Sequence, residues 1–214
     1  METKFKDFKY VRPDVNKLEN EFNSFLKEFN EATSGKSQYE ILKKINKLRA
    51  DYSTMSKIAS IRYTINTDDE FYNKEHDFFD DIGPIVGGLS NKLYNALVKS
   101  IYRKDLEVLC GKQLFNLAEV SVKTFSPEII DDLKKENHLV SRYVKLIASA
   151  KIDFEGEVRN IAGLAPFIES ADRELRKSAL DAKLNFFEEN ETELHTIYDD
   201  LVKLRTAIAK KLGY

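Results

Sequence analysis

The chain has little of what several protein classes need. Its 214 residues include one cysteine, Cys110, so no internal disulfide can form and a reducing compartment is indicated. Only 4 prolines and 8 glycines occur, which leaves room for long helices. No segment comes near the roughly 20 apolar residues of a membrane-spanning helix, and residues 1–5 hold no apolar signal core. We therefore expect a cytoplasmic protein with no membrane partner.

A charge excess of either sign is also missing. The 34 Lys and Arg nearly balance the 36 Asp and Glu, for a net charge of -2. A protein that binds by neutralising phosphates needs a basic excess, so nucleic acid is not expected as a partner. The hydrophobic share of 42%, with 14 Phe and 10 Tyr, indicates a folded core and argues against disorder.

Apolar residues recur every three or four positions along most of the chain, which predicts long amphipathic helices. Pro13 and Asp14 open the first helix, and Ser126-Pro127-Glu128 is the clearest helix start. Gly83-Pro84 should kink the third helix, because proline removes a donor, and Gly87-Gly88 should weaken it. The predicted apolar stripes run from Val15 to Phe29, Ile41 to Ala59, Phe71 to Ile101, Leu106 to Lys123, Ile130 to Ile147 and Leu175 to Leu212.

The pattern changes in five shorter places. The first ten residues are typical of an extended arm. The helix over 106–123 should be interrupted or begin near Gly111, and a short helix over 160–168 should be broken by Pro166. Residues 152–158 alternate around a glycine and predict a β-hairpin. A bend is expected between Phe187 and Leu194. The predicted class is all-α, with long antiparallel helices and one small β-hairpin near residues 152–158.

The three histidines, His76, His138 and His195, lie more than fifty residues apart. No pair is spaced i, i+4, so a helical zinc site with two imidazoles on one face is excluded. No glutamate stands three residues before any histidine, which argues against a di-metal carboxylate bundle.

Two polar groups still invite a metal interpretation. Glu191, His195 and Asp199 share one helical face, but one straight helix cannot close three ligands around an ion. Glu75, His76, Asp77, Asp80 and Asp81 form an acidic group without the glycine-punctuated loop of a calcium site. Solvated polar faces explain both groups more simply. Cys110 has no nearby histidine and fits a packing role. We therefore assign no catalytic, cofactor-binding or metal-binding residue.

The last helix should end in a cap, with Gly213 left-handed and Tyr214 closing it. We expect this helix to pack against a further part of a larger protein. Its apolar residues Leu201, Leu204 and Ile208 should then be exposed in the chain by itself and favour self-association.

Five segments together resemble the thimet oligopeptidase and oligoendopeptidase F family, and the oligoendopeptidase F branch in particular. They recur in the family's order and cover essentially the whole chain. The segments are residues 8–14 (FKYVRPD), 123–128 (KTFSPE), 146–152 (LIASAKI), 172–179 (DRELRKSA) and 204–214 (LRTAIAKKLGY).

The resemblance implies the N-terminal lobe of a cytosolic zinc metallopeptidase that cuts short peptides in a channel between two helical lobes. The lobe would form one wall, and its partner would be a C-terminal catalytic domain beyond Tyr214. That domain would carry the zinc and the His-Glu-x-x-His helix, which has no counterpart here, so the chain alone is expected to be inactive. The implied parts are a helical hairpin region at 1–110, an oligoendopeptidase F N-terminal-type region at 111–170, and a long helix at 171–214 that leads into the catalytic domain.

A different class stays open: a stand-alone helical interaction or scaffold protein that keeps the peptidase scaffold. A reading frame that continues past Tyr214 into His-Glu-x-x-His favours the peptidase lobe, and a stop codon there favours the scaffold. A third hypothesis, a metal-binding bundle at Glu191, His195 and Asp199, predicts bound metal that His195→Ala removes.

Overall fold

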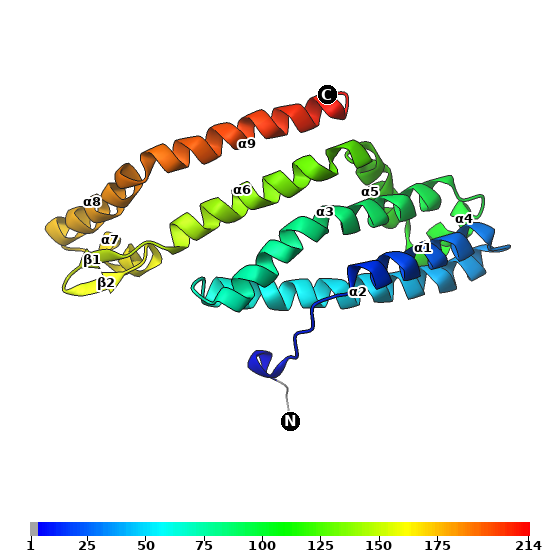
Figure 1. Ribbon diagram of the computed structural model, residues 1–214, viewed down its shortest axis with the longest axis horizontal. Helices are drawn as coiled ribbons and strands as arrows, with labels where there is room; N and C mark the ends of the chain where they lie inside the picture. Colours follow the sequence, from blue (N-terminus) through cyan, green and yellow to red (C-terminus); the bar gives the residue numbers. More distant parts are fainter. Residues whose placement is uncertain (1–3) are drawn as a thin grey trace. The chain divides into compact units, whose positions relative to one another are not determined.

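The computed structural model describes residues 4–214, so the first three residues of the expected N-terminal arm lie outside it. The described chain is helical apart from one two-stranded sheet, which confirms the all-α prediction (Figure 1). It divides into two compact units, one of residues up to Lys134 with Ile208–Tyr214, the other of Lys135–Ala207. The threefold division expected from the sequence stays a prediction. Within 4–214 no helix is both long and apolar enough to span a bilayer.

Polar side chains cap the first three α-helices of the first unit. Asp14 accepts a hydrogen bond from the Lys17 amide, Ser34 accepts one from the Ser37 amide, and Asp69 accepts from two amides at the next helix start. The elements are a 3₁₀ turn at Phe5–Asp7, α1 (Val15–Glu31), α2 (Gly35–Ile65), α3 (Glu70–Lys99), α4 (Arg103–Cys110), α5 (Lys112–Lys123) and a 3₁₀ turn at Pro127–Ile129 that leads into α6 (Ile130–Ala148).

The core of the first unit lies where α1, α2, α3, α4 and α5 meet. Phe22 and Phe29 of α1 pack against Ile45 of α2, Leu93 of α3 and Phe115 of α5, and all five are essentially inaccessible. These residues belong to the predicted stripes, so helical spacing alone places them on one face.

Helix α3 runs without a break through Pro84 and both glycines that follow it. Figure 1 shows the helix curving along its length, as a proline within a helix favours. The predicted interruption near Gly111 is confirmed: this residue has φ +82° and separates α4 from α5.

The second unit contains the predicted hairpin. Strand β1 (Ile152–Phe154) pairs antiparallel with β2 (Glu157–Arg159), and Asp153 faces Val158. A 3₁₀ turn (Ala162–Leu164), α7 (Ala165–Ile168) and α8 (Arg173–Glu189) follow. The side chains of Ile152, Phe154, Leu164 and Ala179 form a small second core.

Pro166 and Asn190 mark points where helices of this unit begin or end. Pro166 was expected to break a helix, but it stands in the first turn of α7, where its missing N–H costs no helical hydrogen bond. The bend expected between Phe187 and Leu194 is confirmed, because α8 ends at Glu189 and α9 (Glu191–Lys211) begins after Asn190.

The cap predicted at the end of the last helix is present. Gly213 has φ +85°, its amide donates to the Lys210 carbonyl, and the Tyr214 amide donates to the Ala209 carbonyl. These are the two hydrogen bonds of a Schellman motif.

Candidate functional site

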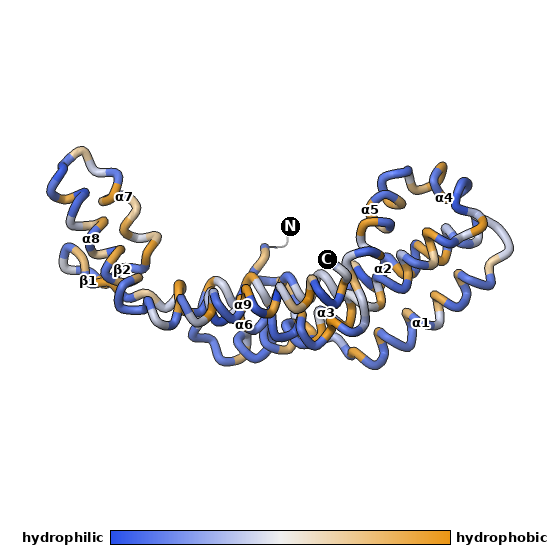
Figure 2. Tube along the Cα trace, turned by 90° about the horizontal axis from the view of Figure 1, so that it is seen from above, coloured by the Kyte–Doolittle hydropathy of each residue, from blue (hydrophilic) through white to orange (hydrophobic). Residues whose placement is uncertain are grey.

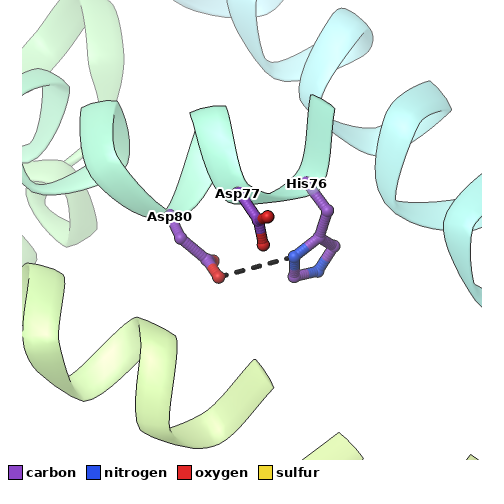
Figure 3. Close-up of side chains that lie close together, drawn as sticks. All are labelled: His76, Asp77 and Asp80. Carbon is purple, nitrogen blue, oxygen red and sulfur yellow. Dashed lines mark ion pairs between the residues drawn. The ribbon is translucent and has the colours of Figure 1, made fainter. Parts of the chain in front are cut away.

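Three of the acidic-group residues come together on α3. His76, Asp77 and Asp80 offer ligand atoms that all lie within 4.8 Å of one another, and Figure 3 shows the three side chains on one side of the helix. His76 Nδ1 lies 3.4 Å from an Asp80 carboxylate oxygen, one helical turn away. All three side chains are half-buried, so the cluster is partly screened from water.

Tyr63 of α2 packs against this cluster. Its ring centroid lies 4.2 Å from that of His76, and its side chain is fully buried. Burial, with smaller contributions from the charges of Asp77 and Asp80, raises the pKa of Tyr63 to about 12. The tyrosine therefore stays protonated at neutral pH.

The other two members of the predicted group do not join it. Asp81 is exposed. Glu75 turns toward the N-terminal arm, where its carboxylate accepts hydrogen bonds from the Arg12 guanidinium and the Tyr10 hydroxyl. The Arg12 hydrogen bond and, more weakly, that from Tyr10 hold the pKa of Glu75 below its usual range against the opposing effect of burial.

The cluster does not match a peptidase zinc site. Catalytic zinc takes three protein ligands in sets such as three histidines or two histidines and a glutamate, whereas this group has a single imidazole. Calcium would need six or more oxygens, which two carboxylates cannot supply. We assign the cluster no metal and derive no chemistry from one.

The second candidate group, Glu191, His195 and Asp199, does not converge in the structure. His195 Nδ1 lies 3.9 Å from Glu191, and both side chains are exposed. Asp199 pairs instead with Lys203 at 2.5 Å. These three side chains therefore form a polar helix face, which agrees with the interpretation of this group as a solvated surface and not as a metal site.

Cys110 packs at the edge of the first core. It is half-buried, and burial raises the pKa of its thiol. A thiol whose pKa is raised is a poor nucleophile at neutral pH, which agrees with a packing role.

Helices α6 and α9 form an antiparallel pair, tied by ion pairs from Arg205 to Glu136 at 2.7 Å and from Arg142 to Glu193 at 2.5 Å. Both views show the two helices side by side (Figures 1 and 2). Leu201, Leu204 and Ile208 were expected to be exposed, but they are half-buried. The expectation was wrong because α6 covers part of that stripe.

An apolar groove of about 590 Å³ lies between α6 and α9 within the second unit. Val140 and Tyr143 of α6 line it with Leu194, Tyr198 and Leu201 of α9. The sequence did not predict this surface. The only local signal was that Leu194, Tyr198 and Leu201 recur at helical spacing, which does not tell a covered face from an open one.

Comparisons with known proteins bear on the whole chain. Residues 5–125 match the family described as Peptidase M3 N-terminal domain. No curated protein matches the chain. Three solved structures do, and the chain spans only 38% of the length of each.

The similarity to these structures is high. PZ peptidase A, solved with an inhibitor, is 54% identical over 99% of this chain, with a TM-score of 0.96. A protein assigned as oligoendopeptidase F is 53% identical over 100%, with a TM-score of 0.97. Another, from Bacillus anthracis strain Ames, is 46% identical over 98%, with a TM-score of 0.95. The chain belongs to the M3 peptidase family, in which it corresponds to the N-terminal portion of an oligoendopeptidase F.

Proposed function

We propose that this chain is the non-catalytic lobe of a cytosolic zinc oligoendopeptidase and forms one wall of its channel for short peptides. One observation carries the proposal. Nearly the whole of this chain superposes on solved peptidases, but it covers only 38% of the length of each of them. The zinc and the groups that activate water would then belong to the remainder of such a protein.

The ligands present in the chain support this division of labour. The His76 cluster lacks the second imidazole of a peptidase zinc site, and burial raises the pKa of the Cys110 thiol. What the chain supplies is a set of long helices. Such a wall would admit extended peptides and exclude folded proteins by size.

The lobe's flexing point would be the glycine pair of α3. Gly87 lies mid-helix, and a Cβ added there meets no atom within 4 Å. A Cβ at Gly88 comes no closer than 3.4 Å to Phe125, which is ordinary contact. If channel closure bends α3, Gly87→Ala and Gly88→Ala change kcat or KM in the complete enzyme. Unchanged kcat and KM would remove the flexing point from the proposal.

A chimera tests the main proposal. This chain replaces the corresponding segment of PZ peptidase A, and the purified product is assayed on short peptides with and without a chelator. We expect chelator-sensitive hydrolysis of peptides and no cleavage of folded proteins. A folded, zinc-loaded chimera without peptidase activity contradicts the proposal and favours the alternative of a stand-alone interaction or scaffold protein.

A further inference from the structure

We propose that the α6/α9 groove lined by Val140, Tyr143, Leu194, Tyr198 and Leu201 is the docking surface for the catalytic portion of the enzyme. This inference rests on the proposed function and names the surface through which the two parts join. The first support is the exposure of the lining: the side chains of Tyr198, Tyr143 and Val140 are 71%, 45% and 39% accessible. Large apolar side chains gathered in one open groove typically mark an interaction surface.

The second support is that this helix pair has almost no core of its own. In α9 only Ile197 is fully buried, and in α6 the side chains from residue 135 onward include no fully buried apolar residue. Amphipathic helices normally bury a full stripe against neighbours. Here the ion pairs Arg142–Glu193 and Arg205–Glu136 tie the helices together, and the groove stays open between them. Another layer of protein is needed to cover it.

The length of the relatives indicates what that layer is. The part that matches here is 38% of each solved relative, and the rest of each relative belongs to the same polypeptide as the matched lobe. A polypeptide joined to the lobe has a high effective concentration at its surface. It is therefore favoured as occupant over a second copy or a free peptide.

The charge of the groove describes the matching face. The lining includes Arg205 and His195 and no carboxylate. Because Arg205 already pairs with Glu136, the docking partner should present aliphatic or aromatic side chains at its centre and neutral polar groups at its rim.

Hydroxyl-radical footprinting of the isolated chain and of the PZ peptidase A chimera tests this. In the isolated chain Tyr143 and Tyr198 should be labelled freely. In the chimera their labelling should fall by about threefold or more, because the centre of an interface excludes water. Equal labelling of both tyrosines in the two proteins overturns the proposal. So does protection in the isolated chain that appears with dimerisation, because the occupant is then a second copy.

Two matched variants separate docking from folding. Tyr198→Asp should leave the thermal midpoint of the isolated chain unchanged, since the side chain is already 71% accessible there. In the chimera it should raise the labelling of Tyr143 above that of the unsubstituted chimera, because a buried unpaired charge destabilises the docked state. Thr196→Asp, an exposed control on the same helix, should change neither. If Tyr198→Asp also leaves Tyr143 protected, the groove is not the docking surface.

The outcomes also distinguish this inference from the proposed function. A chimera that hydrolyses peptides but leaves Tyr198 freely labelled supports the peptidase lobe and refutes the docking surface. A chimera that protects Tyr198 but hydrolyses nothing supports docking and refutes the function.

Discussion

Removal of the Arg12 guanidinium should weaken the attachment of the N-terminal arm to the helices beneath it. Glu75 is 3% exposed, and its carboxylate accepts hydrogen bonds from Arg12 at 2.5 and 2.9 Å and from the Tyr10 hydroxyl. Arg12 also stacks 4.5 Å from the centroid of the Phe78 ring. This one arginine therefore provides both the counter-charge and an aromatic contact that hold the arm.

The magnitude follows from these contacts. A hydrogen bond to a charged group contributes about 1.5–3 kcal/mol, and stripping the partner from a buried charge costs about 3–5 kcal/mol. The Arg12 side chain is 50% exposed, so water reaches Glu75 once the arginine is gone and the cost is smaller. We expect Arg12→Ala to lower the free energy of unfolding by about 2 kcal/mol.

Urea unfolding followed by far-ultraviolet circular dichroism measures this loss, since the chain has no tryptophan. The double variant with Glu75→Gln should lose less than the sum of the two single variants, because each removes the same interaction. Lys17→Ala is the control, since its ion pair with Glu21 is long and exposed. A loss below about 0.5 kcal/mol for Arg12→Ala, equal to that of an ordinary surface change, refutes the reasoning.

The same pair predicts a pH dependence. The folded pKa of Glu75 is lowered, so the stabilisation is complete above the unfolded pKa of about 4.3 and disappears as the pH falls through the folded pKa. The difference between wild type and Arg12→Ala should therefore be constant from about pH 6 to 8 and shrink below about pH 4. A difference that grows on acidification would contradict the assignment.

Three further predictions concern stability and reactivity. Gly87→Ala should raise the free energy of unfolding by about 1 kcal/mol, because the residue is helical and exposed and an added Cβ meets no atom within 4 Å. A destabilised variant would contradict this. Gly35→Ala should lower the free energy of unfolding by about 1–3 kcal/mol in the same urea series, since the new Cβ would lie 2.5 Å from Asp105 Cβ. An unchanged urea midpoint would mean that α4 moves away from the new methyl group at no cost. Cys110 should react with iodoacetamide more slowly than free cysteine at pH 7 and at the ordinary rate in urea, and rapid reaction of the folded chain would contradict its burial.

The helices could be predicted because their signals are local. Ser126-Pro127 marks a helix start, Gly111 marks a break, and residues 152–158 alternate as a hairpin does. Each signal acts within a few residues, where backbone and capping preferences decide the structure. For Pro166 the sequence predicted a helix break, whereas the structure places this residue in the first turn of a helix.

The site required long-range information that periodicity does not carry. Arg12 and Glu75 stand 63 residues apart, and the stripe of α9 is half covered by α6 from more than fifty residues away. His76 and Asp80 are one turn apart, so their contact could be foreseen, but the burial of Tyr63 against them could not. Charge and apolar residues are visible in a sequence, whereas the partner that covers them is set by tertiary packing.

Complementation in solution tests the central claim most directly. The chain and the part of PZ peptidase A that it does not match are co-expressed as separate polypeptides, and each is also prepared alone. The claim predicts chelator-sensitive cleavage of short peptides by the co-purified pair and none by the chain alone. Robust chelator-sensitive cleavage by the pure chain, or equal cleavage by the remaining portion with and without it, would contradict the claim.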